Sequence, residues 1–195
     1  HICWDGSRAA DYAMRLAGKS YLEIAAQGGG IWSTVTHTRQ AVQEEMARLT
    51  VERAGRMLQG GTTTVEVKSG YGLDVESELT MLRAIQQASE ETRADLVPTC
   101  LAAHIKPKDF DGTGREYLSM VVEKLLPLVK AEGLANRVDI YVDQGAFTVE
   151  EARFYLAAAK ALGFMVTLHA DQFSPGGLRL AVEMGAGSAE HLEAT

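Results

Sequence analysis

The chain has 195 residues, of which 46% are hydrophobic and 23% are charged, and its formal net charge is −7. This is ordinary globular composition and argues against disorder. The acidic balance excludes a nucleic-acid-binding surface, which needs clustered Lys and Arg that the sequence lacks, although one well-placed Arg would still suffice to bind a small anion.

The sequence also bounds the location and the organisation of the protein. No apolar run approaches the roughly 18 residues of a membrane span, and no secretory leader is present. Cys3 and Cys100 match no disulfide or metal spacing and indicate a reducing cytoplasm. The chain opens at His1 rather than at Met, so we expect a segment to precede it. Its length suits one domain rather than two.

Strands and helices alternate along the first half of the chain. A long connection over residues 6–31 comes first, and long connections in compact domains are often lids or binding loops. The pattern then predicts a helix over 38–59, a strand over 62–68, a helix over 75–91 with Asp74 as its N-cap, and a strand over 96–104.

The same alternation continues in the second half. Thr113 with Glu116, and Thr148 with Glu151, have the spacing of a capping box, and each pair predicts the start of a helix. Pro127 is expected to kink or end the first of these helices. Strands over 138–143, 164–169 and 188–192 and a short helix near 176–184 complete the pattern.

Serial strand–helix units predict a parallel sheet. Polar residues such as Asp139 and Tyr141 alternate with apolar ones, which favours a (β/α)8 TIM-type barrel with a shared interior over a doubly wound sheet, the alternative. Five strands are expected, with residues 1–4 as the remnant of a sixth. A complete barrel typically needs about 250 residues. We therefore expect an incomplete barrel of about strands 1–6, forming a single domain over residues 1–195 that is truncated at both ends.

Three of the five histidines stand at or near the C-terminal ends of predicted strands: His104, His169 and His191. In a parallel barrel these ends converge on one mouth, where imidazoles could ligate Zn or Fe or move protons near neutral pH. For any single histidine, a structural role in the core or on the surface is the simpler interpretation. His37 lacks such a placement and is expected at the surface.

Two connections carry further candidates, each with two interpretations. In the segment KSGYGLD (68–74), the glycines either only form a tight turn or also hold Tyr71 over the mouth as a hydrogen-bond donor. Arg8 lies seven residues after His1 and is either an exposed solubilising residue or a bidentate clamp for a carboxylate.

Motifs across the whole chain resemble those of the imidazolonepropionases, metal-dependent hydrolases of the amidohydrolase superfamily. The matching segments occur in the family's order: HxxxxGxR at the start, YLEIAAQGGGI, TTTVEVKSGYGLD, LAAH, HADQ followed by two glycines, and SAEHLE. EVKSGYGLD and HADQ are the most specific of them. The resemblance implies hydrolysis of the cyclic amide of 4-imidazolone-5-propanoate to N-formimidoyl-L-glutamate, a cytoplasmic step of histidine degradation.

The resemblance also implies roles for individual residues. His1 matches the second His of a His-x-His metal pair, and His169 matches a further ligand of one Zn or Fe ion. The substrate-binding positions are matched by Arg8, Tyr21, Tyr71, His104 and Gln172. His191 is a candidate for proton transfer, and His104 is counted with it as catalytic. Asp171 is either a partner of a metal ligand or a residue of the next helix's N-terminus.

Some features depart from the family pattern. The Asp that the superfamily contributes from strand 8 has no counterpart before Thr195, and position 172 is Gln where some relatives have Glu. We therefore expect little activity from this segment alone. The expected partner is the small substrate, with no nucleic acid or membrane, and a homodimer is suggested by the family. Two rival functions stay open: another amidohydrolase, such as a deaminase or dihydroorotase-like enzyme, and a non-catalytic barrel that binds small anions.

Overall fold

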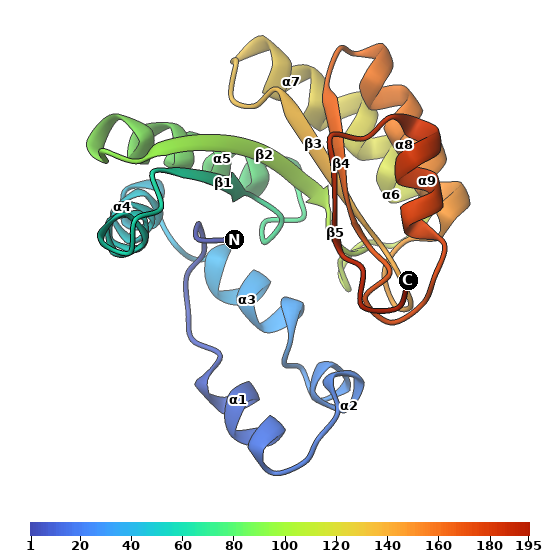
Figure 1. Cartoon of the computed structure of the whole chain (residues 1–195), viewed down its shortest axis with the longest axis horizontal. Coiled ribbons are helices and arrows are strands. Elements are labelled where there is room, and N and C mark those ends of the chain that lie inside the picture. The colour runs from blue at the N-terminus through green and yellow to red at the C-terminus, as the bar shows by residue number, and fades with distance from the viewer.

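A computed structural model describes the backbone of residues 1–195 and every side chain except that of Leu22. Its described residues form five strands in one parallel sheet with the order β1-β2-β3-β4-β5. The strands are β1 (Thr64–Lys68), β2 (Asp95–Ala103), β3 (Arg137–Val142), β4 (Met165–Ala170) and β5 (Ser188–His191). The sheet curls into a half-barrel (Figure 1), so the predicted incomplete TIM-type barrel is confirmed.

Helices lie on the convex side of the sheet (Figure 1); the first of them precedes β1 and packs on the second, and the others link successive strands. They are α4 (Gln43–Gln59), α5 (Val75–Glu91), α6 (Gly114–Met120), the π-helix η1 (Val121–Leu125), α7 (Leu126–Ala131), α8 (Val149–Ala161) and α9 (Gly177–Met184). The alternation of strand residues separates two environments. Val138 and Ile140 are buried in the apolar core, while Lys68, Asp139 and His169 meet inside the half-barrel.

The helix starts agree with the sequence signals. Thr113 and Thr148 each form the predicted capping box, and the Asp74 side chain accepts a hydrogen bond from the N–H of Ser77. Satisfying these free N–H groups fixes where each helix begins. No helix among the described residues is long and apolar enough to span a membrane.

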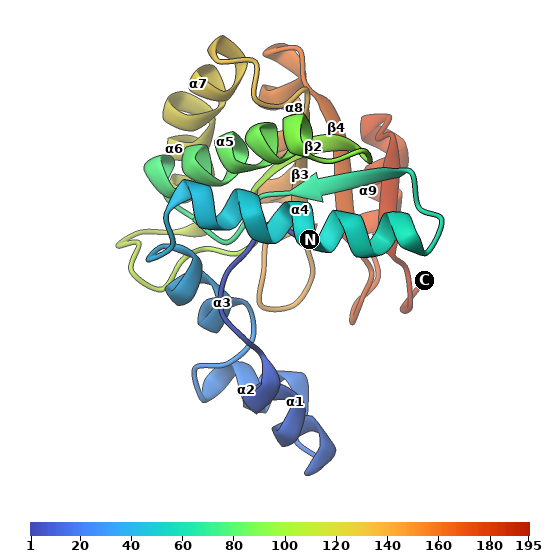
Figure 2. The ribbon, with the colours of Figure 1, turned by 90° about the vertical axis from the view of Figure 1, so that its left-hand side faces the viewer.

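The N-terminal part of the chain differs from its prediction. Residues 1–4 form no strand in the described structure. The connection over 6–31 contains α1 (Ala9–Leu16) and α2 (Tyr21–Ala26), which extend away from the sheet (Figure 2). The single helix expected over 38–59 is instead α3 (Ile31–Thr38) followed by α4, because the backbone breaks between Arg39 and Val42.

Pro127 does not end its helical run. Proline lacks an N–H, and its ring clashes with the carbonyl four residues earlier in a regular α-helix. The chain avoids this clash because α6 widens into η1 before α7 begins, with Pro127 in the first turn of α7. A widened turn of this kind is a known way for a helix to absorb a local conflict.

Candidate metal and substrate site

A cavity of about 310 Å³ lies at the C-terminal ends of the strands. Its lining consists of His1, Arg8, Tyr21, Ile31, Tyr71, His104, Tyr141, His169, Gln172, Glu190 and His191. All eight residues that the sequence singled out for metal, substrate or catalysis are in this set. The structure thus brings all eight residues into one cavity. A more open hollow of about 620 Å³ against α9 is lined without any histidine.

Four imidazoles line the cavity. Nε2 of His1 lies 3.1 Å from Nε2 of His169. The ring of His1 stacks on that of His104 at 5.2 Å between centroids, and the rings of His169 and His191 are 5.3 Å apart. His37 lies on the exposed surface, as expected. The separation of the two Nε2 atoms suits two ligands of a single ion, since Zn–N bonds are about 2.0–2.1 Å long.

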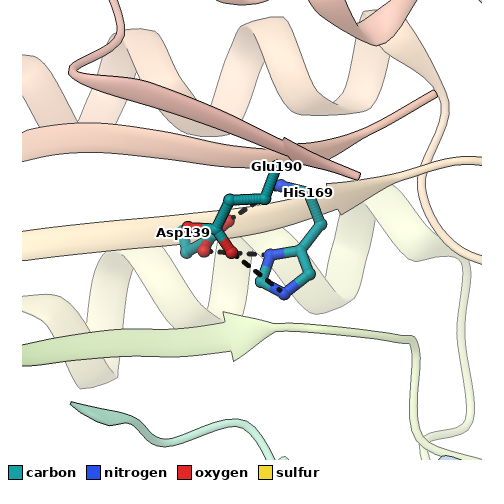
Figure 3. Close-up of side chains that lie close together, drawn as sticks. All are labelled: Asp139, His169 and Glu190. Carbon is teal, nitrogen blue, oxygen red and sulfur yellow. Dashed lines mark hydrogen bonds and ion pairs between the residues drawn. The ribbon is translucent and has the colours of Figure 1, made fainter. Parts of the chain in front are cut away.

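The second ring nitrogen of His169 faces a buried carboxylate (Figure 3). Its Nδ1 lies 3.0 Å from Oδ2 of Asp139, at an angle outside that of a regular hydrogen bond. The ammonium group of Lys68 contacts two carboxylates of this cluster: its Nζ is 2.6 Å from Oδ2 of Asp139 and 2.5 Å from Oε1 of Glu190. A carboxylate on Nδ1 favours a hydrogen there and leaves Nε2 free as a ligand, the usual arrangement at metal-binding histidines.

The charges in this network stabilise one another. Burial alone would raise the pKa of Asp139, but His169 and Lys68 more than offset it and lower this pKa to about 2. Burial likewise acts to lower the pKa of Lys68, and the carboxylates of Asp139 and Glu190 outweigh it and raise this pKa. A buried ion pair of this kind holds only while both partners are present.

Two donor sets in the described residues could hold an ion. Asp139, His169 and Glu190 each place a ligand atom within 4.8 Å of the others. Both of these carboxylates already bind the ammonium of Lys68, however, which occupies their shared space. The two free Nε2 atoms of His1 and His169 therefore fit a metal better, and imidazole nitrogen suits either Zn or Fe.

His104 presents a neutral imidazole to the cavity. Its Nδ1 lies 2.9 Å from the carbonyl oxygen of Gly70. Because a carbonyl can only accept, Nδ1 carries the hydrogen and Nε2 is an acceptor. Burial lowers the pKa of His104 to about 3, so the ring is uncharged near neutral pH. Burial also raises the pKa of the neighbouring Tyr71 hydroxyl, which stays protonated and able to donate.

The loop after β4 is held by two aspartates. Asp143 accepts hydrogen bonds from the N–H groups of Gln172 and Phe173, and the Tyr141 hydroxyl donates to Oε1 of Gln172 at 2.8 Å. Asp171 accepts from the N–H of Gly177 at 2.6 Å, at the start of α9. Of the two roles considered for Asp171, the structure places it at this helix N-terminus.

The remaining candidates enter from the rim. Nε of Arg8 donates to Oγ1 of Thr34 at 2.8 Å, which orients the guanidinium beside the cavity. Burial raises the pKa of the Tyr21 hydroxyl. His191 has φ of 76° and Leu192 has φ of 65°, conformations that non-glycine residues rarely adopt. Such strain is more common at functional sites than elsewhere.

Sequence reasoning assigned no role to Lys68, Asp139, Tyr141, Glu190 or Ile31. The sequence did indicate where Lys68, Asp139 and Tyr141 would point. They stand at alternate positions of strands whose polar side chains were expected to face the barrel interior. Glu190 follows the same alternation as part of β5. Ile31, an apolar residue at a helix start, carried no signal that would separate it from the core.

Comparisons with known proteins give close relatives by sequence and distant ones by fold. No family model matches the chain. The imidazolonepropionase of Myxococcus xanthus (strain DK1622) is 48% identical over 194 residues, which is 99% of this chain and 46% of that protein. Those of Symbiobacterium thermophilum and Streptococcus sanguinis are 48% and 47% identical over 98% of this chain and 46% of each relative. The chain thus spans about half the length of the curated relatives it matches.

Among solved structures, the 5-methylcytosine deaminase from Klebsiella pneumoniae liganded with 5-fluorocytosine matches with a TM-score of 0.55. It is 18% identical in sequence, and the match covers 77% of this chain and 36% of the deaminase. At that identity the match supports the fold alone. The resemblance that the motifs predicted is confirmed by the curated relatives.

Proposed function

The chain is homologous to the imidazolonepropionases along nearly its whole length, and on that basis we propose that the protein carrying it hydrolyses 4-imidazolone-5-propanoate to N-formimidoyl-L-glutamate. The observation that carries this proposal is the convergence, in one cavity, of residues from six separate motifs along the sequence. A cavity of about 310 Å³ is at the lower end of the usual size for small-molecule sites.

One Zn or Fe ion would be held by Nε2 of His1 and Nε2 of His169. When bound, such an ion makes a water molecule acidic enough to act as a nucleophile near neutral pH. The chain's own contribution is to hold His169 in the correct tautomer through Asp139, and to keep that carboxylate charged through Lys68.

The cavity residues would recognise the ring and its tail separately. Nε2 of His104 would accept a hydrogen bond from a ring N–H, and Gln172 would bind the ring's other polar edge. Arg8, Tyr21 and Tyr71 would bind the propanoate carboxylate and so orient the ring. His191 is exposed at the rim and is the candidate for moving a proton.

Turnover of the proposed substrate tests this function directly. The protein that carries this chain should convert 4-imidazolone-5-propanoate to N-formimidoyl-L-glutamate. The loss of the absorbance of the imidazolone ring measures this conversion. A variant His169→Gln should lose this activity, while His37→Gln, a surface change of the same kind, should keep it. Hydrolysis of neutral cyclic amides in preference to this substrate would favour the rival amidohydrolase reading, and no turnover of either would favour an anion-binding barrel.

Two further properties belong to this proposal, the compartment and the oligomeric state of the protein. Cys3 and Cys100 are both buried and unpaired, which suits a reducing cytoplasm. A homodimer is suggested by the family alone. Sedimentation of the intact protein measures the second property, and a monomer at micromolar concentration would contradict it.

A further inference from the structure

Glu78 carries a carboxyl group that has no access to solvent. It lies in the first turns of α5 and its exposure is 0%. One oxygen, Oε1, accepts hydrogen bonds from the N–H groups of Gly70 at 3.1 Å, Gly72 at 2.8 Å and Leu73 at 2.9 Å. Burial raises the pKa of this carboxyl, and the hydrogen bonds from the loop act against the rise.

Helix capping does not explain the position of Glu78. Asp74 already caps α5 through the N–H of Ser77. A buried carboxylate costs several kcal/mol unless polar groups compensate for its lost hydration. Here the compensation comes from the loop over residues 69–73, which connects β1 to α5 and carries Tyr71 into the cavity.

This loop packs closely against its neighbours at two glycines. Gly70 has φ of 103°, and a Cβ there would lie 2.7 Å from the carbonyl oxygen of Leu101. A Cβ on Gly72 would lie 2.6 Å from the backbone nitrogen of Glu78. Both positions therefore require glycine, and at these two residues the path of the loop is fixed by hydrogen bonds to the backbone; at its start, the Ser69 hydroxyl also accepts the N–H of Leu101.

The hydrogen bonds of the loop lead to the cavity. Glu78 holds the N–H of Gly70 and that of Gly72, which belong to the peptide units on either side of the Gly70–Tyr71 peptide. The carbonyl of that central peptide accepts the Nδ1–H of His104 at 2.9 Å. Towards the C-terminal end of the loop, Nε of Arg39 donates to the carbonyl oxygen of Gly72 at 2.6 Å. With both flanking peptides fixed, the direction of the Gly70 carbonyl is fixed as well.

We propose that Glu78 is a positioning residue of the substrate site: by holding the loop over residues 69–73, it selects the Nδ1–H tautomer of His104 and sets the direction of Tyr71. That His104 and Tyr71 bind substrate rests on the proposed function. The tautomer itself can be measured without substrate.

The test compares Glu78→Gln with Glu76→Gln in the full protein that carries this chain. Gln has the shape of Glu and can keep one accepting oxygen, but it loses the charge. Glu76 is an exposed residue of the same helix. The ring nitrogens of ¹⁵N-labelled histidines are recorded by NMR, with the His104 signals assigned from a His104→Gln variant.

We expect the wild type and Glu76→Gln to show His104 in the Nδ1–H form, and Glu78→Gln to show a mixture of both tautomers. Binding of 3-(imidazol-4-yl)propanoate, an inert ring with the same tail, should weaken about tenfold in Glu78→Gln only, as for the loss of one well-oriented hydrogen bond. An unchanged tautomer and an unchanged affinity in Glu78→Gln would overturn the proposal.

Two further results keep the inference separate from the proposed function and from a folding defect. A changed tautomer in Glu78→Gln, in a protein that does not turn over the substrate, supports the positioning role and contradicts the function. If Glu78→Gln does not fold, amide exchange in the wild type decides. Slow exchange at Gly70, Gly72 and Leu73 supports the proposal, and exchange at the rate of an open loop overturns it.

Discussion

At the scale of single residues, the site depends on buried polar groups that act through one another. Lys68, Asp139 and His169 form a chain of contacts of 2.6 and 3.0 Å that ends at Nδ1 of His169, the ring nitrogen opposite the proposed metal ligand Nε2. Removing one member leaves its partner charged, buried and unpaired, which typically costs several kcal/mol. The roles of these residues are therefore coupled and should be measured in pairs.

Asp139→Asn should weaken metal binding by roughly 10- to 100-fold, the usual effect of removing the partner of a metal-binding histidine. The reason is that Asn is a poorer acceptor for the Nδ1–H of His169, so the ring loses its fixed tautomer. Competition with a chromogenic chelator measures the affinity. Asp95→Asn, an exposed change in the adjoining strand, is the control, and equal affinities in the two variants would contradict the assignment.

Arg8→Met should raise the KM for 4-imidazolone-5-propanoate roughly 10- to 100-fold, because a charge-assisted hydrogen bond contributes about 1.5–3 kcal/mol. The kcat should change much less, and neutral cyclic amides should show no comparable effect. Steady-state kinetics separate the two constants. Arg15→Met, on the exposed side of α1, provides the matched variant; a KM unchanged by Arg8→Met would remove Arg8 from the carboxylate site.

His104 should make stability depend on pH. Its pKa is about 3 in the folded chain, mainly because of burial, against about 6.5 when unfolded. Protons therefore bind the unfolded chain more readily, so stability is highest above pH 6.5 and falls as the pH drops towards 3. Between pH 6 and 4 this group contributes a slope of about 1.4 kcal/mol per pH unit. Urea unfolding at several pH values gives the free energy of unfolding as a function of pH. For His104→Gln, the slope of that free energy against pH should be smaller than in the wild type by this amount. Equal slopes in the two proteins would mean that the imidazole of His104 is exposed or charged.

The sequence predicted which residues would line the cavity better than it predicted how they are held. Histidines at strand ends and the Gly-rich loop were visible because barrel topology brings such positions together. Glu78 was not assigned, since a charged residue on an amphipathic helix is usually exposed, and Lys68 was expected to face the interior without a role. Only the packing of the loop reveals that Glu78 is buried.

At the scale of elements, local signals determined the structure where a capping residue was present. The helix expected over 75–91 is α5 with the same bounds, and both predicted capping boxes formed. Ser20 and Glu23 form a third box, at the start of α2, which was not predicted. By contrast, α1 has no side-chain cap and no buried residue, so no capping residue marked its start.

Thr148→Ala should lower the free energy of unfolding by about 1 kcal/mol, because the N–H of Glu151 loses its side-chain acceptor. Thr148→Ser should restore most of that loss, since it returns the hydroxyl. Thermal and urea unfolding both report the difference. A loss of stability that Ser does not restore would point to packing of the threonine methyl group and not to capping.

At the scale of the whole molecule, the parallel topology explains why Tyr71, His104, His169 and His191 meet. Each helix returns the chain to the same end of the sheet, so every strand delivers its last residues to one edge. The curl of the sheet then turns this edge into a cavity wall (Figure 1). The order of the strands could be predicted from the sequence, whereas the placement of residues 1–31 could not, because no regular repeat governs it.

The metal content of the intact protein tests the central claim most directly. Purified without chelators, the wild type should hold about one Zn or Fe per chain by elemental analysis, and His37→Gln should hold the same amount. His169→Gln should lose it, because one of the two Nε2 ligands is gone. A wild type without bound metal, or a His169→Gln variant that retains a full equivalent, would contradict the account.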